Sequence, residues 1–172
     1  MEIFFFGLIL VALMVYASTK IKKSAARAFE REEIETEDFS IIKPEGFLHP
    51  LKDDSPLAFE AYSKDLGKND ASKFSQSWVA LRVISDSDFK TVCGNVKASA
   101  DKILSKNFVE NKKIGLFETG RIENDVEILS FWKIVESRER RKIYELKVSV
   151  LKAYETDFAQ RAGEMIESFT VK

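Results

Sequence analysis

The sequence predicts an α+β protein in which an N-terminal transmembrane helix precedes an antiparallel β-sheet packed by two amphipathic helices. Three observations lead to this prediction. Residues 3–19 contain no charged side chain, several later stretches alternate with the period of a strand, and two others repeat apolar residues every three or four positions. We expect a membrane anchor at residues 1–19, a charged linker at 20–38 and one globular domain at 39–172.

The apolar stretch at the start of the chain predicts where the protein is located. Its 17 residues would reach roughly 26 Å as a helix, close to a hydrocarbon core of about 30 Å. Val15, Tyr16 and Ala17 also fit a signal-peptide cleavage site, but positive charge follows this stretch and does not precede it. Basic residues beside a span stay in the cytoplasm. We therefore expect a single-pass protein of the cell membrane with its N-terminus outside and its domain in the cytoplasm, flanked at the bilayer by Lys20, Lys22, Lys23 and Arg27.

The linker, residues 20–38, contains no Gly or Pro, so we expect the membrane helix to continue through it. Its net charge is +4 over residues 20–31 and −5 over residues 32–38. This pattern predicts a solvated stalk that contacts lipid head groups at its base. The alternative is an apolar stripe that packs on a neighbouring membrane subunit.

The composition of the domain argues against several classes of function. From residue 39 onward it holds 22 basic and 21 acidic residues, a balance that does not suit a nucleic-acid binder. Cys93 has no cysteine to pair with, and His49, beside Pro50, has no ligand at metal spacing. The sequence also lacks a glycine-rich phosphate loop and a serine elbow. We therefore expect a protein that is not an enzyme and has neither cofactor nor metal.

The first half of the domain predicts three strands, a loop and a helix. Strands are expected at residues 39–43, 57–64 and 76–85, and all three prolines lie in the loop 44–56. Asp88 can cap a helix over residues 88–106, whose apolar stripe includes Cys93 as a small buried side chain.

The second half predicts strands at residues 108–119 and 121–136, joined by a turn at Gly120. A charged hairpin loop, 137–141, leads into a cleanly alternating strand, 142–153. An amphipathic helix over residues 154–169 closes the domain.

Two short motifs resemble a known family. Residues 41–47, IIKPEGF, form a strand that enters a Pro-x-Gly-aromatic turn, and the last helix ends in MIESF at 165–169. With the order of the elements, these motifs resemble the PsbP and Mog1-like family. The resemblance implies an α/β/α sandwich used as an accessory or binding module, which in that family docks on photosynthetic membrane complexes or on small GTPases. The photosynthetic members are exported to a lumen, unlike the cytoplasmic domain expected here, and no family site residue matches this chain.

We therefore expect a membrane-anchored interaction module, an accessory or assembly subunit of a larger membrane complex. Its expected partners are the lipid bilayer and the subunits of that complex. The alternative is a membrane-tethered domain that binds a lipid or another small ligand in its phenylalanine-rich core.

Two surfaces are candidates for contact with a partner. If both helices cover the sheet face of Val79 and Leu81, the opposite face leaves Trp78, Arg82 and Trp132 for a protein partner. The alternative is that each helix covers one face and both tryptophans are core residues. The hairpin is interpreted as a solvated tip, with contact to lipid phosphates as the alternative; its basic cluster consists of Arg138, Arg140, Arg141 and Lys142.

Overall fold

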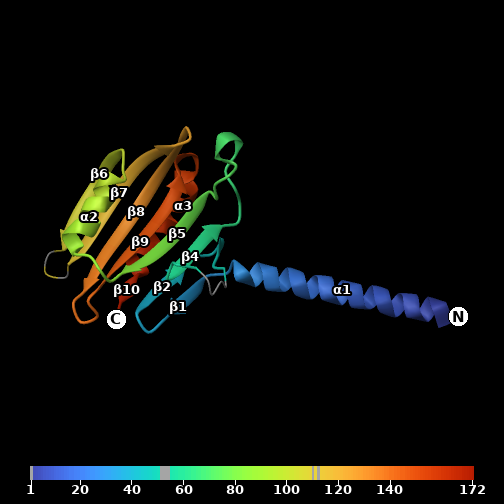
Figure 1. The fold of residues 1–172 in the computed structure, drawn as a ribbon. Helices are drawn as coiled ribbons and strands as arrows, with labels where there is room; N and C mark the ends of the chain where they lie inside the picture. The colour runs from blue at the N-terminus through green and yellow to red at the C-terminus, as the bar shows by residue number, and fades with distance from the viewer. Residues whose placement is uncertain (1, 51–54, 110, 112) are drawn as a thin grey trace.

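A long helix, α1 (Glu2–Ala28), projects from one end of a β-rich domain (Figure 1). The computed structural model describes residues 2–50, 55–109, 111 and 113–172, and it describes the side chains of α1 only outside residues 2–9, 12, 21 and 23–25. Within this part of the chain, no helix meets the length and hydrophobicity needed to cross a bilayer. The predicted span, residues 3–19, includes side chains outside the described part.

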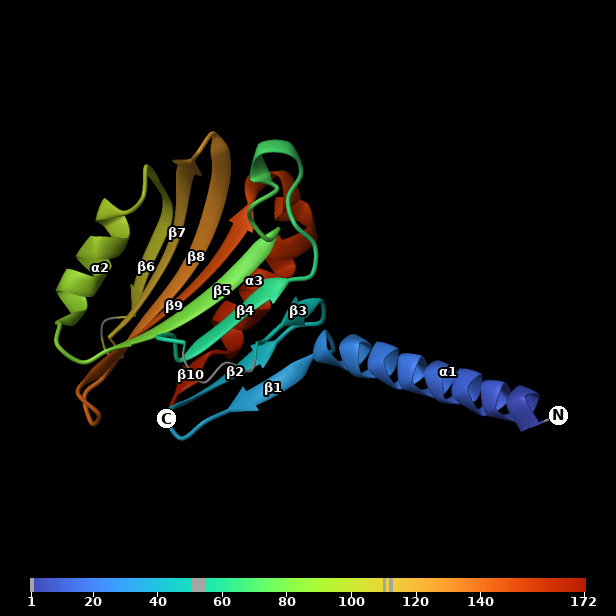
Figure 2. The same ribbon diagram turned by 45° about the vertical axis from the view of Figure 1, so that its right-hand side comes forward.

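The domain contains two antiparallel sheets. The main sheet has the strand order β3-β4-β5-β9-β8-β7-β6 and the small sheet has the order β1-β2-β10. The small sheet lies beside the main one, with the C-terminus next to β1 (Figure 2). The elements are β1 (Glu32–Glu35), β2 (Phe39–Lys43), β3 (Phe47–Leu48), β4 (Phe59–Ser63), η1 (Asn69–Ala71), β5 (Ser77–Ile84), α2 (Phe89–Ala98), β6 (Lys102–Val109), β7 (Ile114–Glu123), β8 (Val126–Ser137), β9 (Lys142–Leu151), η3 (Lys152–Tyr154), α3 (Glu155–Ser168) and β10 (Thr170–Val171).

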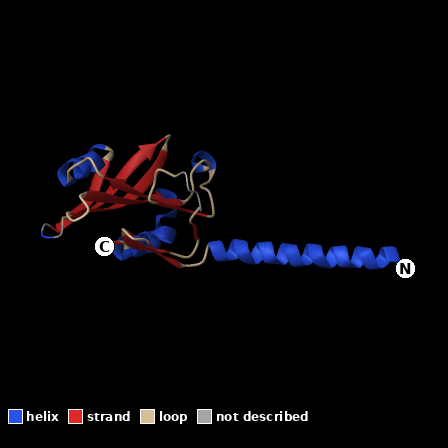
Figure 3. Cartoon of the chain, turned by 60° about the horizontal axis from the view of Figure 1, so that its bottom comes forward, coloured by secondary structure: helices blue, strands red, loops and turns tan. Residues whose placement is uncertain are grey.

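The two helices of the domain, α2 and α3, lie on opposite sides of the main sheet (Figure 3). On one side, α3 and β2 cover an apolar face; this core includes Ile41, Leu81, Leu146, Val148, Phe158 and Met165. On the other side, α2 buries a smaller cluster that includes Val92, Val96, Phe117, Trp132 and Ile134. The alternative that each helix covers one face is therefore confirmed.

Because both faces are covered, the alternating strand β9 is buried on both. Glu145 and Ser149, which its alternation places on the solvent side, are buried at 8% and 0% exposure. Ser149 is accommodated by hydrogen bonding, since its backbone carbonyl accepts from the hydroxyl of Ser77 at 2.9 Å and its own hydroxyl lies 3.1 Å from that of Ser130.

The charged linker is not one continuous helix. Helix α1 ends at Ala28, and residues 32–35 form strand β1, which pairs with β2. Just after the helix, the carbonyl of Phe29 accepts a 2.8 Å hydrogen bond from the N–H of Gly46. Gly46 has a φ of +91°, in the left-handed region that glycine adopts without strain. Residues 32–35, which we expected in the linker, therefore belong to the small sheet.

The helix predicted over residues 88–106 is also shorter than expected. Helix α2 begins after Asp88, whose carboxylate accepts from the N–H of Thr91 at 3.0 Å, and it ends at Ala98. The backbone N–H of Asp101 then donates to the carbonyl of Gly120 at 3.1 Å. The Asp101 carboxylate accepts from the N–H of Ile122 at 2.7 Å. These two hydrogen bonds hold Asp101 beside β7, so the chain continues as strand β6 and not as helix.

The turn between β7 and β8 lies at Asn124 and Asp125, and the prediction of a turn at Gly120 is wrong. Both turn residues have positive φ, 50° and 63°, as a two-residue hairpin of the type favoured by strand twist requires. Gly120 lies inside β7, where it pairs with Lys102 and Leu129.

The buried ammonium group of Lys43 connects the end of α1 to the domain. It donates to the carbonyls of Ala28 at 3.1 Å, Glu30 at 2.6 Å and Phe47 at 3.0 Å. A cation at this position satisfies carbonyls that a helix C-terminus leaves unpaired. Lys133 does the same for α3, donating to the carbonyls of Ile166 at 2.8 Å and Phe169 at 2.7 Å.

We predict that Lys43→Met lowers the free energy of unfolding by about 3 kcal/mol, because three backbone carbonyls lose their donor. Urea denaturation of the full chain in detergent micelles measures this change. Lys90→Met, at an exposed position of α2, is the matched control and should change stability by less than about 0.5 kcal/mol. Equal effects of the two substitutions would contradict a structural role for Lys43.

Candidate interaction surface

Strand β6 forms one edge of the main sheet and presents an apolar surface. In the part of the chain that the structure describes, it pairs with β7 alone, and every one of its residues is exposed. An edge strand of this length has free backbone donors and acceptors that can pair with a strand from another chain. Its exposed apolar side chains, together with one from β7, are Ile103, Leu104, Phe108, Val109 and Ile122.

Aromatic packing under α2 holds this edge in place. The ring of Phe108 meets Phe117 edge to face, with centroids 5.4 Å apart, and Phe89 at 6.5 Å. The ammonium of Lys97 lies 5.8 Å from the Phe108 centroid. Contacts with Phe117 of β7 and Phe89 of α2 therefore hold strand β6 in place, although all of its residues are exposed.

The three residues predicted to contact a partner, Trp78, Arg82 and Trp132, differ in how far they are buried. Trp132 is buried at 7% exposure under α2 and its indole N–H donates to the hydroxyl of Thr119 at 2.9 Å. Trp78 is half-buried and stacks on Phe74, with centroids 6.0 Å apart. The structure thus places Trp132 in the buried cluster under α2, and contact of Trp78 or Trp132 with a partner stays a prediction.

Arg82 alone of these three is exposed, with 65% of its side chain accessible. One guanidinium nitrogen lies 3.8 Å from a carboxylate oxygen of Glu145, which is longer than a hydrogen bond. Within the described part of the chain Arg82 makes no hydrogen bond, so its donors can meet another ligand, and its contact with a partner stays a prediction.

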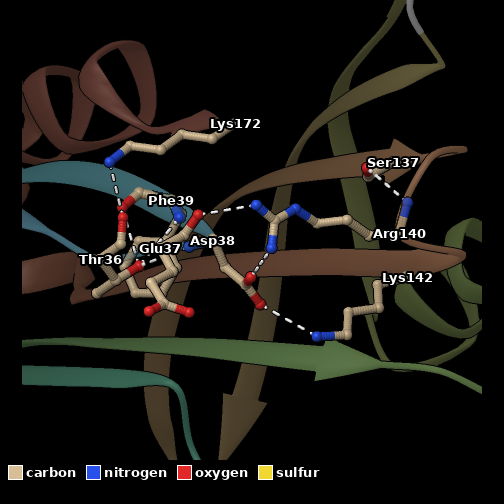
Figure 4. A network of polar contacts seen from close by, with 8 residues as sticks. All are labelled: Thr36, Glu37, Asp38, Phe39, Ser137, Arg140, Lys142 and Lys172. Carbon is tan, nitrogen blue, oxygen red and sulfur yellow. Dashed lines mark hydrogen bonds and ion pairs between the residues drawn. The ribbon is translucent and has the colours of Figure 1, made fainter.

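Half of the basic hairpin cluster is engaged within the domain. Arg140 and Lys142 both contact the carboxylate of Asp38, Lys142 at 3.1 Å, and Arg140 also donates to the carbonyl of Glu37 at 2.9 Å (Figure 4). These contacts join the hairpin to the turn between β1 and β2. The other two members, Arg138 and Arg141, line a pocket with Asp88 and Glu136, and their contact with lipid phosphate stays a prediction.

The turn that presents Asp38 is itself built on hydrogen bonds. The hydroxyl of Thr36 accepts from the N–H of Phe39 at 3.0 Å, and the ammonium of Lys172 donates to the carbonyl of Thr36 at 2.7 Å (Figure 4). The hydrogen bond from Lys142, with the charge of Arg140, lowers the pKa of Asp38. Burial, with the charge of Asp38, raises the pKa of Tyr144, and within the described residues the Tyr144 hydroxyl is buried without a hydrogen-bond partner.

Cys93 and His49, the two residues considered above for reactivity or metal binding, both pack within the domain. Cys93 is buried under α2, and burial raises the pKa of its thiol to about 11, so the thiolate needed for a nucleophile is scarce at neutral pH. A ring nitrogen of His49, Nδ1, lies 2.7 Å from the carbonyl of Glu60, and its ring packs on Phe59 with centroids 4.9 Å apart. Among the described residues, no three His, Cys, Asp or Glu side chains cluster in a way that could hold a metal ion.

No family model matches the sequence, and no curated protein matches it. Solved structures share its fold. The Ran-binding protein Mog1p of Saccharomyces cerevisiae aligns with a TM-score of 0.56 and 11% identity over 83% of this chain and 96% of its own. LpqN of Mycobacterium tuberculosis, described as involved in cell envelope biogenesis, aligns with a TM-score of 0.56 and 13% identity over 83% of this chain and 91% of its own.

A cyanobacterial PsbP of Synechocystis sp. PCC 6803 aligns with a lower TM-score of 0.42 and 11% identity, over 83% of this chain and 92% of its own. At these identities, the likenesses to Mog1p and LpqN establish the fold. The domain has the Mog1/PsbP-like fold, as the sequence motifs predict.

We predict that Asp38→Asn lowers the melting temperature at pH 7. A carboxylate with a lowered pKa stabilises the fold above its unfolded value of about 3.9, and this contribution is lost as the pH falls through the folded value. The difference in melting temperature between wild type and Asp38→Asn should therefore shrink in acid. Asp86→Asn is the control on an exposed carboxylate; if it has the same effect, the Asp38 contacts are not the cause.

Proposed function

We propose that this chain is a membrane-tethered, non-enzymatic interaction module that acts as an accessory or assembly subunit of a larger membrane protein complex. The exposed edge strand β6 carries this proposal. Its apolar side chains lie on an ordered strand with one side free of pairing in the described part of the chain. Such an edge binds a partner by adding a strand, with backbone hydrogen bonds for affinity and side chains for specificity.

The chemistry of β6 indicates the kind of segment that would bind. Ile103, Leu104, Phe108 and Val109 are all exposed along the strand, and the register shifts at Leu104, between Ile103 and Ser105. The complementary segment is extended, uncharged over several residues and rich in branched or aromatic side chains. Lys102 and Lys106 on the same strand discourage indiscriminate pairing between copies.

A protein partner also agrees with the fold. Mog1p, which shares this architecture, is described as a Ran-binding protein. We propose a protein partner here as well, without transferring the identity of that partner. The near balance of 22 basic and 21 acidic residues in the domain supports the proposal that nucleic acid is not a ligand.

The membrane tether is proposed from α1. The described apolar side chains on its exposed surface, Leu10, Val11, Leu13, Met14, Val15 and Tyr16, are between 59% and 66% accessible, which suits a lipid environment. Lys20, Lys22 and Arg27 follow on the same helix with exposed side chains, whereas the side chain of Lys23 lies outside the described part. This distribution supports an N-terminus outside the cell membrane and a domain in the cytoplasm.

We predict that Leu104→Lys and Val109→Lys each weaken partner binding, by about 2 kcal/mol for a central contact, while the fold is retained. Each new charge would be desolvated beneath an added strand but is solvated in the free protein. Purification in mild detergent with identification of stoichiometric partners measures the loss. The matched control is Leu66→Lys, at an exposed loop leucine, which should keep the partner. Loss of the partner in all three variants, or in none, would contradict the β6 site.

The proposed orientation makes a separate prediction. Protease added to intact cells, or to closed vesicles with the outer face exposed, should leave residues 39–172 uncut. The same protease should cut the domain in inverted vesicles, for example at the exposed Arg138 to Arg141 hairpin. Cleavage of the domain from the outer face would refute the orientation and leave the β6 proposal intact.

A further inference from the structure

A pocket of about 260 Å³ opens on the face of the main sheet that α2 only partly covers. It lies between the last turns of α2 and strands β5, β9, β8 and β7. In Figure 2, β5 and β9 run between α2 and the loop that carries η1. The residues that determine its chemistry are Arg82, Arg121, Trp132, Glu145 and Lys147, with Ser99 at the helix end.

Lys147 is the innermost cation of this pocket. Its ammonium lies 4.6 Å from the centroid of the Trp132 ring, and within the described residues it has no hydrogen bond or ion pair. Burial lowers the pKa of Lys147, and the charges of Arg121 and Arg82 lower it further. The charges of Glu145 and Glu123 oppose this effect. Three positive groups therefore border one space, and the innermost of them is the most desolvated.

The opposing charge in the pocket is insufficient. Glu145 is the carboxylate that lines it, and burial raises the pKa of Glu145. The C-terminal end of α2 adds a partial negative charge of about one half. Glu123, which does not line the pocket, pairs with Arg121 at 3.7 Å. The three cations therefore exceed the neighbouring negative charge only slightly, by about half a charge, and a bound anion would neutralise this excess.

We propose that this pocket binds the phosphate group of a small phosphorylated molecule. The planar guanidinium groups of Arg82 and Arg121 offer paired donors at the rim, and Lys147 offers a point charge at the base. Both arginine side chains are more than half exposed, at 65% and 51%, so they can close on a ligand without disturbing the core. This proposal does not depend on the one made for β6.

The position of the pocket argues against a lipid head group as the source of the phosphate. Helix α1 joins the domain at the end where β1 and β3 lie, whereas α2 lies at the other end (Figures 1 and 2). A bilayer that holds α1 is therefore remote from the pocket. The volume suits a small soluble molecule.

Titration of the full chain in detergent micelles with inorganic phosphate, against chloride at equal ionic strength, tests the proposal. Tryptophan fluorescence reports binding, because Trp132 lines the pocket. We expect saturable binding that weakens at least about tenfold in Arg82→Gln and in Lys147→Gln, and that strengthens in Glu145→Gln. The matched control Lys90→Gln removes one exposed charge outside the pocket and should bind as wild type.

Melting curves of every variant separate lost binding from lost structure, and the exposed position of Arg82 makes its variant the decisive one. Equal binding by wild type and Arg82→Gln, or no saturation in wild type, overturns the proposal. Binding only to vesicles that contain phosphatidic acid overturns it in favour of lipid. Binding only to a glutamate-rich peptide overturns it in favour of a protein carboxylate. Neither result would bear on partner loss in the β6 variants.

Discussion

The buried ammonium of Lys43 is the contact on which the arrangement of this chain depends. It lies among the carbonyls of Ala28, Glu30 and Phe47, while the nearest carboxylate oxygen, on Glu32, is 3.7 Å away. Buried charge is tolerated only where hydrogen bonds replace water. The end of α1, strand β2 and strand β3 must therefore meet at one point. Lys133 donates in the same way to carbonyls at the end of α3. The C-terminal ends of α1 and α3 are therefore each hydrogen-bonded to a lysine from a strand.

The two faces of the main sheet differ in the side chains that cover them. The face under α3 and β2 is closed by apolar side chains, including Leu81, Leu146 and Val148 at 0% exposure. The face under α2 combines an apolar cluster with a charged pocket, and it ends at the exposed strand β6. A closed face supplies stability through burial of apolar area, and this leaves the other face free to carry charge and unpaired backbone. Both surfaces proposed for binding, the pocket beside α2 and strand β6, lie on the face that α2 covers or at its edge.

Strong local patterns predicted the elements that form the closed face. Strand β9 alternates strictly and α3 repeats at three and four, so their positions follow from the sequence alone. Residues 102–109, KILSKNFV, fit a helix and a strand equally well, and only pairing with β7 decides between them. The burial of Trp132 and the exposure of Arg82 depend on which face of the sheet α2 covers. No local sequence pattern determines that choice. The partners of Asp38 are more than a hundred residues away in sequence, and the two-residue strand β10 is too short to have a period.

Strand β10 places Thr170 beside Ser40 and Val171 beside Phe39. Some 130 residues separate the two halves of this ladder, so its loop-closure entropy is among the largest in the fold. On a ribosome, α1 and the β1–β2 hairpin emerge long before their third strand exists. For that interval β2 is an open edge that can pair with another strand. The fold thus leaves its N-terminal hairpin unprotected during synthesis until the segment that completes the small sheet is made.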